Sequence, residues 1–115
     1  MSAETSTGGH HLPDVDRLVH EPARYNIMAL LYVVERADFL FVQNQTRLTP
    51  GNLSAHLTKL ETAGYVAIQK EFVGKRPRTS LSLTVQGREA FGNYHEQMRE
   101  LFARPPGNAT ATDVQ

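Results

Sequence analysis

Residues 49–64, TPGNLSAHLTKLETAG, constrain the fold more than any other part of the chain, because they mark both ends of one helix. Thr49 belongs to a residue type that caps helices by accepting a hydrogen bond from a free amide. Pro50 follows at the first helical position, where its missing N–H is not needed. Gly64 can adopt the left-handed conformation that ends a helix. The segment therefore predicts a helix over residues 49–62.

The two sides of this predicted helix differ in chemistry. At about 100° per residue, Leu53, Leu57 and Leu60 fall on one side. The other side and its flanks carry small or hydrogen-bonding residues, namely Gly51, Asn52, Ser54, Ala55, Thr58, Lys59 and Thr62. A solvated helix face usually carries several long charged side chains, so this composition indicates that another molecule approaches the backbone closely. Nucleic acid is the first candidate, and packed protein is the alternative.

The formal net charge of zero conceals an uneven distribution along the chain. Between residues 47 and 88 there are seven basic and two acidic residues, a local charge of +5 that leaves −5 for the remainder. The basic residues are Arg47, Lys59, Lys70, Lys75, Arg76, Arg78 and Arg88. A concentrated positive field can attract an anionic polymer even when the whole protein is neutral.

Length and composition exclude several classes of protein. The 115 residues suffice for one domain with a single modest core, and the absence of cysteine excludes disulfides and thiolate metal sites. No apolar run approaches the roughly 18 residues of a membrane helix, and the N-terminus lacks the regions of a signal peptide. We expect a cytoplasmic protein without membrane contact. No catalytic motif is found and the histidines are scattered, so we expect no enzyme, no metal site and no cofactor.

The N-terminal third predicts a scaffold helix. Residues 1–13 lack a periodic apolar pattern and are expected to be disordered, and the adjacent His10 and His11 have no partner ligands there. Asp14 or Asp16 can cap a short turn, after which Pro22 opens a longer helix. Its core-facing stripe is expected to consist of Ile27, Leu30, Leu31 and Val34.

A second, shorter helix is predicted directly before residues 49–62. Asp38 can cap residues 39–46, FLFVQNQT, and the residues expected to reach the core are Phe39, Leu40 and Val42. Leu48 then lies between the two helices as an apolar plug. Two helices joined by so short a turn indicate a helix-turn-helix.

After Gly64 the apolar period changes from helical to two, which predicts a β-hairpin with strands over residues 65–72 and 80–84. The connection, residues 73–79, has Gly74 to permit a turn and Pro77 to block strand pairing. Lys75, Arg76 and Arg78 lie within four residues and repel one another. We therefore favour a tip that contacts an anion over a merely solvated loop.

The last helix is predicted after Thr84, which can cap it, and before Pro105 and Pro106. Its apolar stripe consists of Phe91, Tyr94, Met98, Leu101 and Phe102. The stripe can pack on the domain's own core or on a second copy of the chain. We favour a dimer interface over residues 84–104, because little of a small domain remains to cover the far end, and expect residues 105–115 to be disordered.

Helix, helix-turn-helix, hairpin with a basic tip and final helix is the layout of a winged helix, which is mainly α with a two-stranded β-hairpin. Over roughly residues 17–98 the chain resembles the short winged-helix transcriptional regulators allied to the MarR and ArsR groups. The segments that carry the resemblance are ADFLF, LTPGNLSAHLTKLETAGYV and GKRPRTSLSLTVQGREAF. The resemblance implies a homodimeric, sequence-specific regulator of double-stranded DNA, usually a repressor, within residues 14–104. It also implies dimerisation through the terminal helices.

The expected DNA contacts follow from the docking of winged helices, with residues 49–62 in the major groove and residues 74–79 as the wing. Asn52 can pair with adenine, while Lys59 can contact phosphate or guanine. The full expected set is Thr49, Pro50, Gly51, Asn52, Ser54, Ala55, Thr58, Lys59, Lys75, Arg76, Arg78 and Thr79. If both copies of a dimer dock in this way, the operator is an inverted repeat.

Two alternatives stay open at this point. The same fold can serve as a protein–protein interaction module that does not bind DNA. An unidentified small-molecule effector could occupy a pocket of aromatic residues near the dimer interface, although aromatic residues at helical spacing more often form the core. The aromatic residues concerned are Tyr25, Tyr32, Phe39, Phe41, Phe91 and Tyr94.

Overall fold

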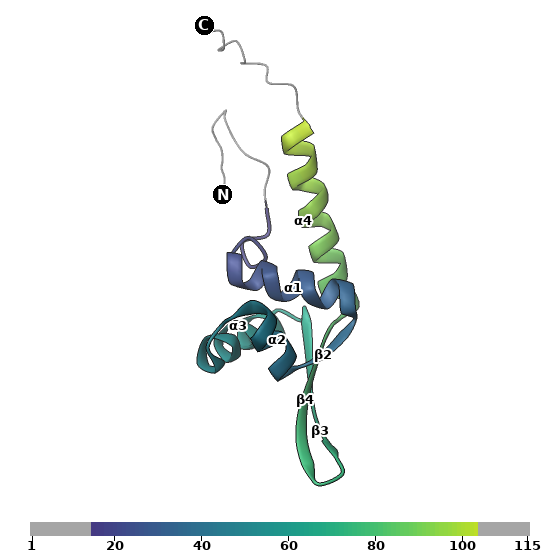
Figure 1. Cartoon of the computed structure of the whole chain (residues 1–115). Helices are drawn as coiled ribbons and strands as arrows, with labels where there is room; N and C mark the ends of the chain where they lie inside the picture. The colour runs from purple at the N-terminus through teal and green to yellow at the C-terminus, as the bar shows by residue number, and fades with distance from the viewer. Residues whose placement is uncertain (1–14, 104–115) are drawn as a thin grey trace, which may run out of the picture.

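The computed structural model describes residues 15–103, which fold into four helices and a three-stranded sheet (Figure 1). The element order is α1 (Pro22–Val34), β2 (Arg36–Asp38), α2 (Phe39–Thr46), α3 (Pro50–Thr62), β3 (Val66–Val73), β4 (Arg76–Leu83) and α4 (Val85–Ala103). The β3–β4 hairpin projects from one end of the body and α4 from the other (Figure 1). The two expected disordered tails, with His10 and His11, lie outside the described residues, and so does Asp14, the alternative cap of the first turn.

The core lies where α1, α3 and the base of the sheet meet. It contains Val19, Ile27, Met28, Leu31, Val42, Leu53, Leu57, Leu60, Val66, Leu81, Leu83 and Phe91. Two expected core residues are exposed, Val34 at 37% and Leu40 at 66%, so these predictions were wrong. Val34 is the last residue of α1, and Met28, which the stripe did not include, is buried instead. The eight-residue α2 buries only Val42 fully, so Leu40 in its first turn points away from the core.

The helix ends agree with the predicted caps. The Thr49 hydroxyl accepts a hydrogen bond from the amide of Asn52 at 3.1 Å, and Pro50 is the first residue of α3. At the other end Gly64 has a φ of +82°, and the amides of Gly64 and Tyr65 donate to the carbonyls of Glu61 and Leu60. This pair of hydrogen bonds is a Schellman motif, which ends α3 by local chemistry alone.

The other caps were also predicted from residue type. Asp16 accepts hydrogen bonds from the amides of Leu18 and Val19, and Asp38 accepts one from the amide of Phe41 at 2.8 Å. The Thr84 hydroxyl accepts from the amide of Gly87 at 2.9 Å. Short polar side chains at these positions satisfy amides that have no partner within the helix.

The sheet has the antiparallel order β2–β4–β3. Residues 36–38 form a short third strand, with Ala37 opposite Leu81, in addition to the two strands predicted from the sequence. The expected loop over residues 73–79 was too long, because residues 76–79 belong to β4 and only Gly74 and Lys75 form the turn. Gly74 has a φ of +65°, as the first position of a two-residue hairpin turn often requires.

Pro77 does not prevent pairing, contrary to the prediction. It lies opposite Phe72, one pair beyond the turn-closing pair of Val73 and Arg76. In an antiparallel hairpin the pair after the turn-closing pair exchanges no hydrogen bonds, so Pro77 directs its missing N–H away from β3. Among residues 15–103, β4 has no partner on that side at this level, because β2 pairs only with residues 80–82. Proline is tolerated at such an open edge.

α4 begins in tight contact with the segment that leaves α3. A Cβ atom added to Gly87 would lie 2.0 Å from the carbonyl oxygen of Tyr65, so only glycine fits there. Tyr65 also accepts a hydrogen bond from the amide of Thr84 at 3.0 Å. These contacts fix the base of the hairpin between α3 and α4.

Candidate nucleic-acid interface

The exposed face of α3 consists of the residues that the sequence predicted. Leu53, Leu57 and Leu60 are at most 2% exposed. The cap residue and the outward residues are all exposed, namely Thr49, Pro50, Gly51, Asn52, Ser54, Ala55, Thr58 and Lys59. Thr58 donates its hydroxyl proton to the carbonyl of Ser54 at 3.0 Å. Within residues 15–103 the side chains of Asn52, Ser54 and Lys59 make no hydrogen bond, so they are available to a ligand.

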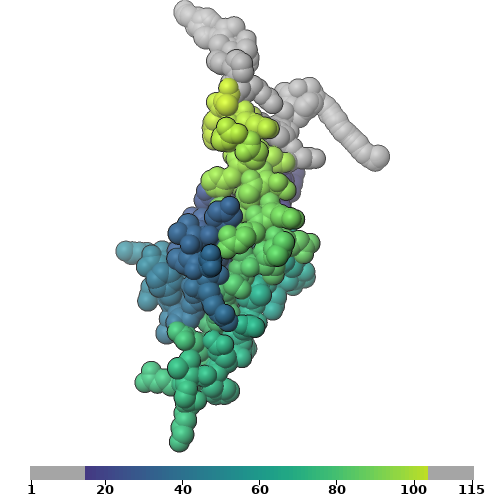
Figure 2. Space-filling model, turned by 90° about the vertical axis from the view of Figure 1, so that its right-hand side faces the viewer, coloured from purple at the N-terminus to yellow at the C-terminus, as the bar shows by residue number. Residues whose placement is uncertain are grey.

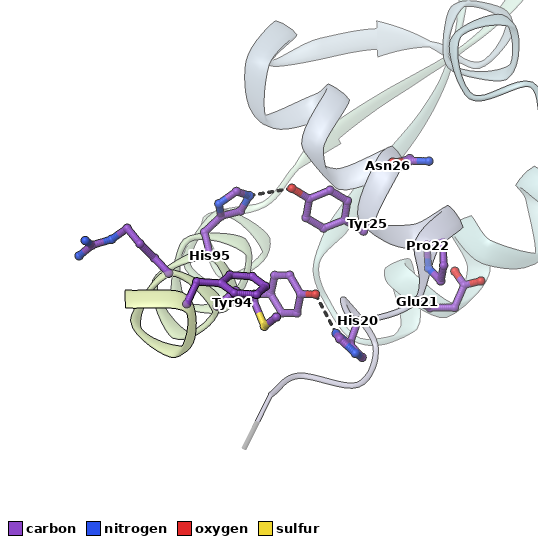
Figure 3. A pocket seen from close by; sticks show the side chains of 10 residues that line it. His20, Glu21, Pro22, Tyr25, Asn26, Tyr94 and His95 are labelled. Carbon is purple, nitrogen blue, oxygen red and sulfur yellow. Dashed lines mark hydrogen bonds between the residues drawn. The ribbon is translucent and has the colours of Figure 1, made fainter. Parts of the chain in front are cut away.

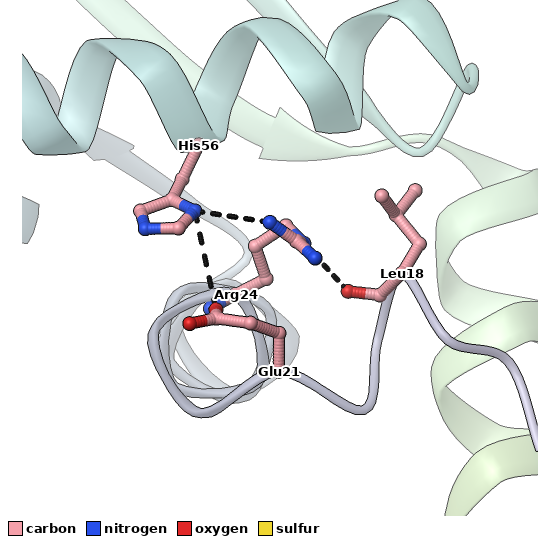
Figure 4. A network of polar contacts seen from close by, with 4 residues as sticks. All are labelled: Leu18, Glu21, Arg24 and His56. Atoms are coloured by element: carbon pink, nitrogen blue, oxygen red, sulfur yellow. Dashed lines mark hydrogen bonds and ion pairs between the residues drawn. The ribbon is translucent and has the colours of Figure 1, made fainter.

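α3 is held against the start of α1 by a polar network around His56 (Figure 4). Arg24 donates from Nε to the carbonyl of Leu18 at 2.7 Å, and its Nη1 lies 3.2 Å from His56 Nδ1. The carboxylate of Glu21, which caps α1, lies 3.9 Å from the same nitrogen. His56 itself is half-buried at the edge of the core. The network positions the middle of α3 and leaves its outer face free.

The basic residues of the hairpin have unequal surroundings. Lys75 lies in the turn and Arg76 at the start of β4, both exposed, and neither forms an ion pair within residues 15–103. Arg78 instead lies 3.8 Å from the carboxylate of Asp38, and its cross-strand neighbour is Glu71. Its charge is therefore partly compensated. Thr79 is half-buried, deeper than a residue at the tip of a wing would be.

Lys70 was not among the predicted contacts, although the structure brings it close to α3. It lies opposite Thr79 on the sheet face that carries Ile68 and Leu81. It lines a cleft of about 630 Å³ together with residues of α3 and α2, which are Phe39, Ser54, Leu57, Thr58 and Glu61. The two-residue alternation of β3 already places Lys70 on the Ile68 face, and that pattern could have identified it.

The C-terminal half of α4 extends beyond the body (Figure 2) and borders a second cleft of about 660 Å³ against the start of α1 (Figure 3). His20 Nδ1 lies 2.7 Å from the hydroxyl oxygen of Tyr94 across it, and the hydroxyl oxygen of Tyr25 lies 2.8 Å from His95 Nε2. Burial, with a smaller contribution from Tyr25, raises the pKa of Tyr94 above its ordinary value. Met98 and Phe102 line the same cleft, and Phe102 is 80% exposed.

The predicted dimer stripe divides in the structure. Phe91 is 5% exposed and packs with tilted rings against Tyr25 and Tyr32, so its assignment to a dimer interface is corrected to the chain's own core. The rest of the stripe, Tyr94, Met98, Leu101 and Phe102, retains exposed surface. The predicted aromatic set divides as well, because only Tyr25 and Tyr94 of its six members line the cleft. The others are core residues or lie elsewhere.

None of the helices among residues 15–103 combines the length and apolar composition that crossing a bilayer requires. Residues 23–102 match the family model described as a winged helix DNA-binding domain. An uncharacterized protein of Methanocaldococcus jannaschii is 36% identical over 85 residues, which cover 74% of this chain and 92% of that protein.

Solved structures with the same fold include a transcriptional regulator homologue from Pyrococcus horikoshii OT3, with 31% identity and a TM-score of 0.72. That match covers 76% of this chain and 86% of the other. NadR in complex with 4-hydroxyphenylacetate has 26% identity and a TM-score of 0.64, over 76% of this chain and 64% of that chain. Overoxidized AbfR bound to DNA, at 17% identity and a TM-score of 0.65 over 74% of this chain and 64% of that chain, shares the fold. This chain belongs to the winged helix DNA-binding domain family and is allied to the MarR-type transcriptional regulators.

Proposed function

We propose that the chain is a homodimeric repressor that binds a specific double-stranded DNA operator, with α3 in the major groove and the β3–β4 hairpin as its wing. The observation that carries this proposal is the division of α3. Its leucine side is buried, while its small and polar side is exposed and stands beside a basic hairpin. Helix-turn-helix proteins bring such a face against base edges, with the N-terminal part of the helix deepest in the groove.

The residues of α3 divide between base and phosphate contacts. The first two turns, residues 51–58, present Asn52, which can make two hydrogen bonds to adenine, and Ser54, which can bond to either base edges or phosphate. Gly51 and Ala55 allow the backbone to approach or meet a thymine methyl group. Lys59 lies later in the helix and faces phosphate. The wing residues Lys75 and Arg76 then neutralise phosphates beside the groove.

The dimer forms through the C-terminal half of α4, where Met98, Leu101 and Phe102 continue an apolar face beyond the body. A second copy packed on this face would place two α3 helices on one side of the duplex. Their half-sites would then form an inverted repeat with centres about 10 bp, or a multiple of it, apart.

The test combines selection of binding sites from random DNA, footprinting and a solution-mass measurement. We expect an inverted repeat, a dimeric mass and loss of footprint when Asn52, Arg76 and Arg78 are all replaced by alanine. Unchanged affinity of the triple variant would refute the proposal. A complex with a protein partner that barely responds to salt would instead favour the interaction-module alternative, because DNA binding weakens steeply as salt rises.

The cleft between α1 and α4 favours an effector as a second partner. It borders the proposed dimer helix, and aromatic and hydrogen-bonding side chains meet in it, among them Tyr25, Asn26, Tyr94 and His95. A small aromatic acid that occupied it would change how α4 sits on α1 and thereby the spacing of the two α3 helices. Titration of aromatic carboxylates into the protein–DNA complex tests this, and release that persists in Tyr94→Leu would count against the cleft.

A further inference from the structure

Phe72 is a large apolar side chain on the most exposed part of the wing. It is 73% exposed, although a phenyl group is usually buried when a core is within reach. Cross-strand pairs define which side of the hairpin it occupies: Val66 with Leu83 and Ile68 with Leu81 are core pairs, and Lys70 with Thr79 and Phe72 with Pro77 continue the same face outward. Phe72 therefore belongs to the face of the wing that continues from the core, and its pair is the second on that face after the last core pair.

Pro77 supports this side chain from the opposite strand. The pair of Phe72 and Pro77 is of the type that exchanges no hydrogen bonds, in which the two side chains approach each other most closely. The pyrrolidine ring has a fixed shape, so the pair presents its apolar surface on one side of the wing.

The charges around Phe72 indicate what covers it. Lys70 lies two residues before it on the same face, Lys75 follows in the turn, and Arg76 pairs with Val73 on the opposite face, all exposed. Glu71, also exposed, is the acidic neighbour on the opposite face. The end of the hairpin therefore keeps a net positive charge around an apolar group, which a nucleic-acid backbone complements better than a protein core does. Proteins that contact the minor groove often insert an apolar side chain between base steps next to such cations.

We infer that Phe72, supported by Pro77, is a specificity-determining residue that inserts into the DNA minor groove beside the half-site and partly unstacks one base step. This inference rests on the proposed function. Because unstacking costs least at pyrimidine–purine steps such as TA, Phe72 confers a preference for such a step at the position the wing reaches. It does so without any hydrogen bond to a base.

The test uses DNA selected by the wild-type protein, with Phe72→Ala and Phe72→Leu as variants. Val73→Ala is the matched control, because Val73 is the next residue, is 53% exposed and lies on the opposite face. Phe72→Ala should lower affinity about tenfold or more with an unchanged salt slope, because a phenyl group neutralises no phosphate. Phe72→Leu should retain most of the affinity, and Val73→Ala should have little effect.

A second readout reports on the base step directly. With 2-aminopurine at a TA step under the wing, wild-type protein and Phe72→Leu should raise its fluorescence by unstacking it, and Phe72→Ala should not. Replacing TA by AA should weaken the wild type but not Phe72→Ala. Equal effects of Phe72→Ala and Val73→Ala, no effect of either, or a change of solution mass in Phe72→Ala would overturn the inference. If the wild type itself shows no salt-dependent DNA binding, the proposed function fails as well.

Discussion

α3 and the wing both extend toward the proposed DNA side, but the core holds them very differently. α3 buries Leu53, Leu57 and Leu60 almost completely and is closed by local hydrogen bonds at both ends. Residues 69–78 of the hairpin are all exposed and are held by cross-strand pairing and by two side-chain contacts at their base, Arg36 with Gln69 and Asp38 with Arg78. Base contacts need side chains held within a fraction of an ångström, whereas phosphate contacts tolerate motion. Under the proposed function, α3 therefore carries base recognition by hydrogen bonds, and the wing contributes mainly affinity, apart from the base-step preference inferred for Phe72.

The largest expected effect concerns stability and tests whether the core holds α3 more firmly than it holds the wing. Leu57→Ala removes a side chain that is 2% exposed, so it should lower the free energy of unfolding by about 2–5 kcal/mol in urea denaturation. Val73→Ala on the wing is the control and should stay within about 0.5 kcal/mol of the wild type. Comparable losses at both positions would mean that the core holds the wing as firmly as it holds α3.

Asn52→Ala tests whether α3 carries base recognition. The variant should lose about 1–3 kcal/mol of discrimination at one base pair of each half-site, while its affinity for unrelated DNA and its salt slope stay the same. Competition binding with single-base variants of the operator measures this. A uniform loss over all sequences would assign Asn52 to phosphate contact and remove the distinction between helix and wing.

Arg76 and Arg78 sharpen the description of the wing, because only Arg78 has a carboxylate beside it. Arg76→Ala should reduce the slope of log affinity against log salt by about 0.9, the value for one phosphate contact. Arg78→Ala should reduce it less, since Asp38 already compensates part of its charge. Binding titrations over a range of salt concentrations compare the two, and a larger change for Arg78 would refute this ranking.

The smallest expected effect lies at the joint between α3 and the wing. Tyr65 donates its hydroxyl proton to Asp16, and this hydrogen bond, together with burial and the Asp16 charge, raises the pKa of Tyr65 from 10.0 to about 12. The folded state thus holds this proton more tightly, so the stabilisation is complete below pH 10 and is lost as the pH rises toward 12. Unfolding measured across this range should show an extra loss in wild type that Tyr65→Phe lacks. Tyr32→Phe is the control and should show the same extra loss as the wild type. If Tyr32→Phe also lacked the extra loss, the assignment to Tyr65 would be contradicted.

The sequence determined the features that depend on neighbouring residues. Thr49, Asp38 and Thr84 cap helices through hydrogen bonds to amides three residues later, and Gly64 ends α3 because it tolerates a positive φ. The leucine period then predicted the buried side of α3. These interactions are local, so residue type and spacing suffice to find them.

Only the tertiary structure decided the features in which distant residues meet. Residues 36–38 become a strand because β4 offers an open edge, and Arg36 donates to the hydroxyl of Ser80, 44 positions later in the chain. In the same way Asp38 lies beside Arg78, and Phe91 packs against Tyr25 and Tyr32 and is thereby part of the core. No local pattern encodes such contacts, because the chain brings these residues together only when the whole core forms. The sequence alone thus located the helix proposed to face DNA, and the tertiary structure separated the exposed cations of the wing that have no ion pair among the described residues from the compensated one.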